Sequence, residues 1–439
     1  MRPFLELLPY RLERSFGWRG LRAARARRAR RRSTSVAATA APPGTLPRLF
    51  IDVAVISSQD AGTGIQRVVR ALAVSLVHAA CAVCEIRFVS ARRKKQYFHI
   101  DWLQDEQASV PRMVPSEEEM RARPGDVFLG LDYSLDSVRR HRGQLAQFRR
   151  DGGKLWFLVH DLLPLNHPDW FSTNTAVRYS AWLGVLAGVA DGFFCNSADT
   201  EAELMAALDR VHGVVEDYGT VVLPMGHAFP TPAVREPTMR PPRVEADPPF
   251  ALMVGTLEPR KGHADVLAAF EELWKEGRPE RLVLVGRRGW QVDDLCDALK
   301  AHPEYGARLL WFDDVDDPEL SGLYTECVGV VVGSHREGFG LPVIEALGHG
   351  KPVLARDIAV FRVHDGKGVH FFPADAGVSQ LAGSIRAWLD ASHHGDIAVV
   401  RPEHNWRMAA RIVLDTLQLN SGTREASASP ATQKMQCSD

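Results

Sequence analysis

The chain has 439 residues and a formal net charge of −1, with 45% hydrophobic and 24% charged residues, a composition typical of a globular protein and not of a disordered or fibrous one. Residues 1–32 hold eleven arginines and two glutamates (+9), whereas the remainder holds 42 basic and 52 acidic residues (−10). Because a body of that charge repels phosphate backbones, the class of uniformly basic nucleic-acid-binding proteins is excluded.

The arginine block lies within residues 1–46, for which we predict a basic, disordered tail outside the fold. It does not resemble a secretory signal, since its apolar run is broken by charge and proline. Its arginines, with Phe4, Leu5, Leu7 and Leu8 as an apolar edge, predict peripheral contact with anionic lipid head groups. The alternative is a terminus with no function of its own.

Nowhere does the chain approach the ~18 consecutive apolar residues that a membrane-spanning helix needs. The six cysteines are scattered, at positions 81, 84, 195, 296, 327 and 437, and do not predict a disulfide framework. Cys81 and Cys84 form one Cys-x-x-Cys pair with no second pair or histidine cluster nearby, so ordinary packing is expected there. We therefore expect a reducing, cytoplasmic environment.

From residue 47 onward, short apolar runs alternate with segments of helical periodicity, which predicts an α/β fold with parallel sheets. The strands expected in the first half span 48–56, 84–90, 125–132, 154–160 and 192–197, and those in the second half span 250–255, 281–286, 308–312, 328–333 and 351–355. Between them, the seven prolines of 230–249 predict a linker, because proline interrupts both strands and helices. The domains are thus expected over 47–229 and 250–401.

After the second domain, a helix is expected over 402–418 that opens at Pro402 and carries its apolar residues on one face. Such a helix could pack back on the first domain. Residues 419–439 show no apolar periodicity and are expected to be disordered.

In the first half, Gly62 and Gly64 lie between the first strand and a helix expected from Val68, at a turn where open α/β sheets bind ligands. Further on, His160 and Asp161 stand at the carboxyl end of a strand. A neutral histidine there could exchange a proton with a reacting hydroxyl, and the aspartate could orient it. The alternative is a structural histidine. Asn196 could reach the same site.

In the second half, Arg260 and Lys261 stand just before Gly262 and a helix. Because a helix N-terminus carries a partial positive charge, two cations beside it are unfavourable unless an anion is bound. The pair therefore indicates a diphosphate site. The alternative is a basic turn exposed to solvent.

The strongest local signal for a ligand site follows the apolar run 328–332, where a loop beginning at Glu337 leads into a helix opened by Pro342. Glycines in this loop allow close approach of a ligand, and the free amides at the helix N-terminus favour an anion. Glu345, placed in the first helical turn, could then accept hydrogen bonds from ribose hydroxyls. The loop residues expected to bind are Gly338, Phe339, Gly340 and Leu341. The alternative is a tight β–α turn without a ligand.

These segments together resemble the bacterial GT-B glycosyltransferases of family 4, the mannosyl- and rhamnosyltransferase-like members, from about Leu46 to Leu417. EGFGLPVIEALGHGKPV resembles the family's Glu-x7-Glu element, and GTLEPRKGH resembles its phosphate loop. DAGTGIQRVVRAL resembles a glycine loop of members that act on lipopolysaccharide or other surface polysaccharides, and VHDLLP resembles a His-Asp segment facing the sugar. LVLVGRRGWQVDDL and the loop near Phe312–Val315 resemble segments that line the nucleobase pocket.

The resemblance implies two Rossmann-like domains that face each other across a cleft, retention of anomeric configuration, and a reaction without metal or any cofactor beyond the nucleotide diphosphate sugar. It implies that Arg260 and Lys261 contact the donor diphosphate and that Glu345 holds the ribose. Glu337 and His160 would act at the sugar as catalytic residues.

One departure concerns the end of the strand before the phosphate loop, where family members often carry Gly-Arg and this chain has Gly255 and Thr256. One phosphate cation is thus replaced, and Arg260 and Lys261 would carry more of the charge.

We therefore expect a hexosyltransferase that transfers a hexose or deoxyhexose from a nucleotide diphosphate sugar to a glycan or lipid-linked acceptor, with no nucleic acid as partner. One alternative is a nucleotide-sugar epimerase of GT-B fold, which would need acid and base groups flanking the sugar C2. The other is a non-catalytic nucleotide-sugar-binding protein, which would bind donor without turnover.

Overall fold

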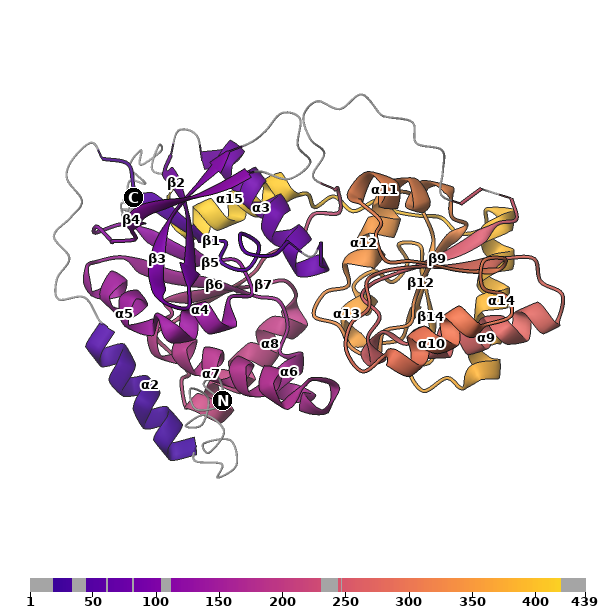
Figure 1. Ribbon diagram of the computed structural model, residues 1–439, viewed down its shortest axis with the longest axis horizontal. Helices are drawn as coiled ribbons and strands as arrows, with labels where there is room; N and C mark the ends of the chain where they lie inside the picture. Colours follow the sequence, from indigo (N-terminus) through magenta and orange to yellow (C-terminus); the bar gives the residue numbers. More distant parts are fainter. Residues whose placement is uncertain are drawn as a thin grey trace, which may run out of the picture.

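The computed structural model describes residues 19–33, 45–60, 62–80, 83–103, 112–229, 244–245 and 247–419. It has two α/β domains, each built around its own sheet, which stand side by side in Figure 1. The expectations for the far N-terminus, for most of the linker 230–249 and for the tail after residue 419 lie outside the described residues.

The first sheet has eight strands in the order β4-β3-β2-β1-β5-β6-β7-β8. They are β1 (Arg48–Asp52), β2 (Glu85–Arg92), β3 (Lys95–Leu103), β4 (Arg112–Glu119), β5 (Val127–Gly130), β6 (Lys154–Val159), β7 (Gly192–Cys195) and β8 (Gly219–Val222). Six of them pair in parallel, but β3 and β4 are antiparallel to their neighbours. The expectation of a wholly parallel sheet is wrong at this edge, because the two-residue connection from β2 to β3 can join only antiparallel strands.

The second sheet is parallel throughout, in the order β11-β10-β9-β12-β13-β14. Its strands are β9 (Phe250–Val254), β10 (Arg281–Val285), β11 (Leu309–Phe312), β12 (Gly329–Val332), β13 (Val353–Arg356) and β14 (Val369–Phe372). The direction of winding reverses between β9 and β12. In open α/β sheets ligands bind beyond the carboxyl ends of the strands at such a point.

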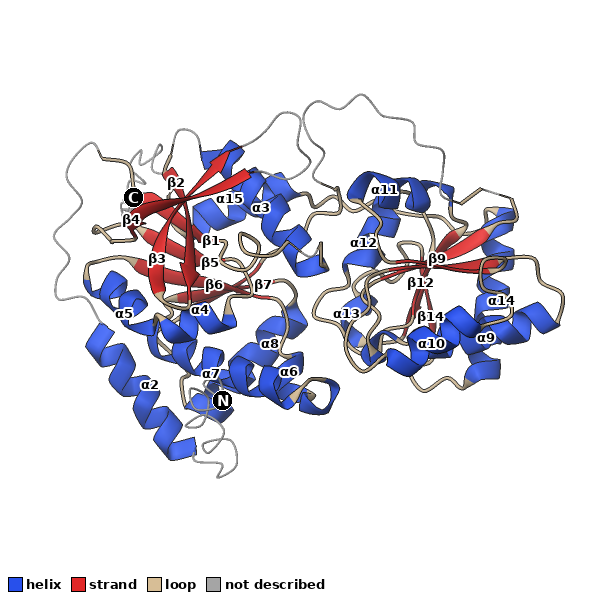
Figure 2. Ribbon diagram, viewed as in Figure 1, coloured by secondary structure: helices blue, strands red, loops and turns tan. Residues whose placement is uncertain are grey.

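Helices cover both faces of each sheet (Figure 2). In the first domain these are α3 (Gly64–Ala80) on one face and α4 (Leu135–Arg140), α5 (Arg142–Arg150), α7 (Thr173–Val189) and α8 (Ala198–Ala207) on the other, with α6 (Leu163–Asn166) beside α7. In the second domain they are α9 (His263–Lys275), α10 (Asp293–Ala301) and α14 (Val378–His394) on one face and α11 (Asp317–Glu326), α12 (Leu341–Gly348) and α13 (Ala359–Arg362) on the other. Alternation along β1 explains the two layers, since Phe50 enters one core and Leu49 and Ile51 enter the other.

Strand β1 ends at Asp52, four residues before the end expected from its apolar run. Two buried carboxylates hold the chain in a turn after this residue, so the chain leaves the sheet there. Asp52 Oδ1 accepts the amide of Ala54 (2.9 Å), and Asp132 Oδ2 accepts the amides of Val55 (2.7 Å) and Ile56 (2.8 Å). These bonds satisfy the amides in a turn, and α3 then begins at Gly64 instead of Val68.

Residues 19–33 form a helix, α2 (Arg19–Ser33), which contacts α7 and α5, so the expectation of a disordered tail is wrong for this segment. Small residues allow the close approach: a Cβ placed on Gly188 of α7 would lie 2.7 Å from the Ala29 Cβ. Arg30 is buried and donates from Nε to the Ala187 carbonyl (2.9 Å) and from Nη1 to the Asp217 carbonyl (2.8 Å).

The last described helix, α15 (Trp406–Thr416), packs on α3 of the first domain (Figure 1). It begins four residues after Pro402 because Asn405 is its N-cap, whose side chain accepts the Met408 amide (3.0 Å). Trp406 Nε1 donates to the Ala228 carbonyl (2.7 Å). This hydrogen bond joins the segment that returns to the first domain to the segment that leaves it.

Candidate donor site at the domain interface

The loops after β9 and β12 bring two cations onto one carboxylate. Arg260 Nη1 donates to Glu337 Oε2 (3.0 Å), and Lys261 Nζ donates to Glu337 Oε1 (2.5 Å). Ser334 Oγ donates to the same Oε1 (2.7 Å). Gly262, with φ of +72°, then turns the chain into α9. The strand order thus gathers the three charged residues at the reversal point of the second sheet.

These charges are buried, so the alternative of a basic turn exposed to solvent is wrong: the side chains of Arg260 and Lys261 are 12% and 14% exposed, and that of Glu337 is 9% exposed. Burial opposes ionisation of Glu337, but the charges of Lys261 and Arg260 outweigh it and lower its pKa to about 2. A second acid, Glu258, lies 2.8 Å from Arg260 Nε. The pairing of cations with acids makes a dense, nearly neutral cluster.

The glycine loop ends on α12, whose N-cap is Gly340 with φ of +89°. Its carbonyl at Gly338 accepts Ser197 Oγ (2.6 Å) and Thr200 Oγ1 (3.2 Å) from the first domain. A Cβ on Gly338 would lie 2.1 Å from the His160 carbonyl oxygen, so only glycine fits there. The predicted anion loop is therefore pressed directly against the predicted sugar-facing segment of the other domain.

His160 is buried beyond the end of β6, and its Nε2 lies 3.3 Å from the Leu131 carbonyl oxygen. Burial lowers its pKa to about 4, although that hydrogen bond opposes the shift, so the imidazole is neutral at pH 7. Asn196 Nδ2 donates to the His160 carbonyl (2.6 Å). Within the described residues, the buried Asn196 Oδ1 has no hydrogen-bond partner and remains available to a ligand hydroxyl.

Glu345 lies in the second turn of α12, not in the first as expected, because the helix begins at Leu341. It is buried, and its Oε2 accepts the Tyr324 hydroxyl (2.8 Å). Its Oε1 forms an ion pair with Arg67 from α3 of the first domain. Burial raises the pKa of Glu345, against the opposing effect of Arg67.

The glycines of the first domain differ in position. Gly62, with φ of +63°, precedes the helix, whereas Gly64 opens it and lies in contact range of the Leu341 side chain (3.5 Å from a Cβ placed on Gly64). Phe339 and Leu341 both pack against the core of the first domain. The structure thus brings residues Gly64, His160, Gly338, Phe339 and Leu341 to one interface.

Sequence reasoning missed Arg67 as a site residue, although it stands one turn after Gly64 in a segment already singled out. It also missed the aromatic contact across the interface, where Trp290 Nε1 donates to the Trp170 carbonyl and the ring of Trp290 lies 5.2 Å from that of Phe171. No short-range pattern signals either contact, since the partners are more than one hundred residues apart.

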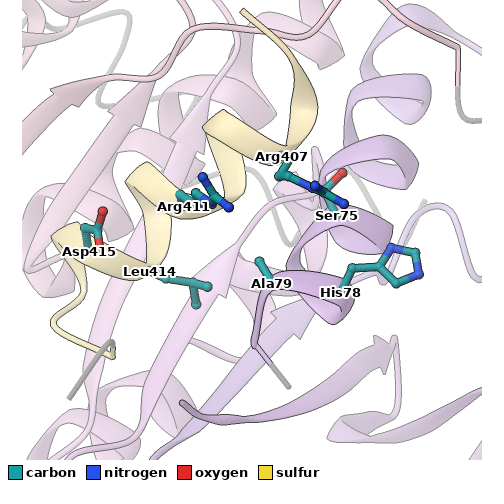
Figure 3. Close-up of a pocket in the computed structure, with 7 residues that line it drawn as sticks. All are labelled: Ser75, His78, Ala79, Arg407, Arg411, Leu414 and Asp415. Atoms are coloured by element: carbon teal, nitrogen blue, oxygen red, sulfur yellow. The ribbon is translucent and has the colours of Figure 1, made fainter. Parts of the chain in front are cut away.

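A pocket of about 540 Å³ lies between α3 and α15 (Figure 3), and none of the candidate site residues lines it. It is lined by Ser75, His78, Ala79, Arg407, Arg411, Leu414 and Asp415. Over the residues that the structure describes, no helix is long and apolar enough to cross a membrane. Over the same residues, no group of three or more His, Cys, Asp or Glu side chains is arranged to hold a metal ion.

Residues 234–411 match the sequence family described as Glycosyl transferases group 1. The chain is similar to the serotype-specific mannosyltransferase WbdA of Escherichia coli, with 31% identity over 383 residues that cover 85% of this chain and 45% of that protein. It is also similar to the O-antigen chain mannosyltransferase B of Escherichia coli, with 38% identity over 113 residues that cover 25% of this chain and 29% of that protein. The matched segments therefore cover less than half the length of each of these relatives.

Among solved structures, the sucrose-phosphate synthase from Thermosynechococcus elongatus superposes with a TM-score of 0.57 at 18% identity, covering 85% of this chain and 96% of that one. The two chains share their fold, and the two-domain GT-B architecture expected from the sequence is confirmed. Fold likeness of this kind does not identify a substrate.

Proposed function

We propose that this chain is a glycosyl transferase of group 1, the family that its residues 234–411 match, and that it transfers a hexose or deoxyhexose from a nucleotide diphosphate sugar to a glycan or lipid-linked glycan. The similarity to two mannosyltransferases, one of them named for the O-antigen chain, supports mannose or a mannose-like sugar and a surface polysaccharide as acceptor.

One observation carries this proposal: the cations Arg260 and Lys261 and the N-terminus of α12 meet His160 and Asn196 at one interface. Cations and helix amides suit a diphosphate. A neutral imidazole and an amide suit sugar hydroxyls. A donor bound there would contact both domains.

In the proposed reaction, the bond between the anomeric carbon and the diphosphate oxygen breaks, and an acceptor hydroxyl oxygen bonds to that carbon. The hydroxyl proton passes to the departing diphosphate oxygen on the same face, which gives retention. Arg260, Lys261 and the amides of Gly338–Leu341 stabilise the charge that develops on the diphosphate. Contact with both domains excludes water, which would otherwise hydrolyse the donor.

His160 and Glu337 would bind the transferred sugar. When His160 Nε2 donates to the Leu131 carbonyl, its Nδ1 is left as an acceptor for a sugar hydroxyl. Glu337 stays ionised and, although paired, keeps lone pairs for another hydroxyl. Glu345 would accept the ribose hydroxyls in the same manner. Because Arg260, Lys261 and the amides at the start of α12 would all donate hydrogen bonds to the leaving group, we propose that no metal takes part, and excess EDTA should leave the transfer rate unchanged.

The test is a transfer assay with the purified full chain, a panel of nucleotide sugars that includes GDP-mannose, and mannose-terminated oligosaccharides as acceptors. We expect one donor to extend an acceptor, as seen by mass spectrometry, with retained anomeric configuration by NMR. Donor converted to another nucleotide sugar without an acceptor would favour the epimerase. Donor binding without turnover would favour the non-catalytic protein.

We further propose a cytoplasmic enzyme in peripheral contact with an anionic membrane. The support is α2, which has eight arginines and no acid, and which exposes Arg25, Arg27, Arg28 and Arg31 while Ala23 and Ala26 are buried against the domain. Clustered arginines add attraction to anionic lipid surfaces of about 1 kcal/mol each.

Co-sedimentation with vesicles tests the membrane contact. The wild type should bind phosphatidylglycerol vesicles and not phosphatidylcholine vesicles, and 0.5 M salt should release it. The double variant R27E/R28E should lose most of this binding while it keeps transfer activity on a soluble acceptor. Equal binding of the variant and the wild type would rule out α2 as the contact.

A further inference from the structure

The first domain inserts one cation into the second domain beside α12. Arg67, in the first turn of α3, pairs with Glu345 Oε1, and its guanidinium carbon lies 4.7 Å from the ring centroid of Phe229. Its Nε is 3.7 Å from Asp317 Oδ1 at the start of α11. The side chain of Arg67 is 13% exposed and that of Glu345 is 5% exposed, so this pair is largely shielded from water.

The groups that surround Glu345 explain why the pair matters. Besides Arg67, it is contacted by the Tyr324 hydroxyl, and the ring of His349 stacks on that of Tyr324 with centroids 5.0 Å apart. Asp317 is a second negative charge nearby, which disfavours ionisation of Glu345, whereas His349 favours it. A buried carboxylate without a cation is strongly unfavourable. Within the described residues, Arg67 is the arginine that forms an ion pair with Glu345, and it belongs to the other domain.

A hydrogen bond to a ribose is stronger when the accepting carboxylate is ionised and held in one orientation. Separation of the two domains would withdraw Arg67 and leave Glu345 with Tyr324 and the like charge of Asp317. The carboxylate would then be less ionised and less fixed. When the domains meet, Arg67 restores the charge and occupies one oxygen, which leaves lone pairs of both oxygens for other donors.

We propose that Arg67 is a positioning residue that couples domain closure to donor binding: by pairing with Glu345 across the interface, it completes the ribose site only when the two domains are in contact. This proposal rests on the proposed function, because it takes Glu345 to be the ribose ligand. A donor that binds Glu345 therefore favours the closed arrangement, and closure in turn tightens donor binding.

The experiment is isothermal titration of the full chain with GDP, UDP, ADP and dTDP, each in turn, to find the diphosphate that the wild type binds. With that diphosphate, Arg67→Met should weaken binding about tenfold, and Arg67→Lys should recover part of the loss because one charge returns. Glu345→Gln should also weaken binding. The double variant R67M/E345Q should be no weaker than the weaker single variant, since both changes remove the same pair.

Arg70→Met is the matched control. Arg70 stands one turn further along α3 and pairs with Asp60 (2.7 Å) and, more distantly, with Asp317 (3.6 Å), but it does not contact Glu345. This variant should bind the diphosphate within about twofold of wild type. Melting temperatures of all variants show that each is folded. A purely structural role for Arg67 would lower its melting temperature without the non-additivity.

The outcomes separate the two proposals. If the wild type binds none of the four diphosphates and no nucleotide sugar, the proposed function fails and this inference fails with it. If the wild type binds a diphosphate and Arg67→Met binds it equally or more tightly, the proposed function stands. Arg67 is then either irrelevant or a competitor of the ribose, and the coupling is refuted.

Discussion

At the scale of single residues, the candidate site is governed by buried charges that need one another. Glu337 is ionised because Lys261 and Arg260 surround it, and each of these cations would be costly to bury without it. The acids of this cluster hold its cations in fixed positions, which is the preorganisation that the proposed diphosphate site requires.

The Glu337 charge predicts a dependence of stability on pH. Its pKa in the fold is about 2, below the ordinary value, so its contribution is complete above ~pH 4.5 and disappears as the pH falls towards 2. Glu337→Gln should therefore unfold more easily than wild type at pH 7, by on the order of 3 kcal/mol, and the difference should shrink at pH 3. Urea unfolding at both pH values measures it.

The exposed Glu326→Gln serves as the matched control for that measurement, with an expected change within ~0.5 kcal/mol. A destabilisation by Glu337→Gln that is the same at pH 7 and pH 3 would contradict the assigned charge.

The placement of the second-domain residues at one end of the sheet could be predicted from the sequence because they lie in two local patterns, a strand followed by Arg260 and Lys261 and a glycine loop before Pro342; their role in binding stays a prediction. Arg67 could not, because its partner is 278 positions away and the pairing depends on how the domains meet. The sequence also does not show that Arg260 and Lys261 are paired with acids, since the acidic residues Glu258 and Glu337 come from different loops.

At the scale of elements, the end of β1 depends on two buried acids that no periodicity reveals. Burial, reinforced by the nearby charge of Asp132, raises the pKa of Asp52 to about 7. Burial also raises the pKa of Asp132 to about 6. The apolar run that continues past Asp52 favours a longer strand, but the hydrogen bonds from Ala54, Val55 and Ile56 override it.

Asp52→Asn tests this arrangement. Because the pKa of Asp52 is raised in the fold, its contribution to stability is present below ~pH 4 and is lost as the pH rises towards 7. The amide cannot ionise and can still accept the Ala54 amide. The variant should therefore gain stability over wild type between pH 4 and pH 7, by on the order of 4 kcal/mol. Urea unfolding that shows no such trend would contradict a protonated Asp52.

Helix α2 could not be predicted from the sequence because its alanines and arginines give no apolar periodicity. Its docking relies on the fit of Ala29 against Gly188 and on the buried Arg30. Such contacts are specific to the folded surface of α7 and have no local sequence signature.

Ala29→Leu should displace α2, since the added side chain has no room beside Gly188 and overpacking costs ~1–3 kcal/mol. We expect trypsin to cleave within α2 about tenfold faster than in wild type. Ala24→Leu, at an exposed position of the same helix, is the control and should be cleaved at the wild-type rate. Equal rates for both variants would mean that this contact does not hold the helix.

At the scale of the whole molecule, the two passages of the chain between the domains are bound to each other. His227 Nδ1 lies 3.1 Å from the His404 carbonyl oxygen, and Trp406 donates to Ala228 on the first-domain side. A Cβ on Gly226 would lie 2.6 Å from Trp406, so the two passages touch. A paired crossing of this kind suits a hinge, about which the domains could close on a donor.

The measurement that tests the central claim most directly is kcat/KM for sugar transfer by Lys261→Ala beside its control Lys275→Ala. Lys261 contacts Glu337 at the interface, whereas Lys275 is exposed at the far end of α9. If Lys261 stabilises the departing diphosphate, its loss should lower kcat/KM by ~100-fold or more, measured at a temperature where the variant is still folded, and Lys275→Ala should match wild type. Wild-type transfer by Lys261→Ala would contradict a donor site at this interface.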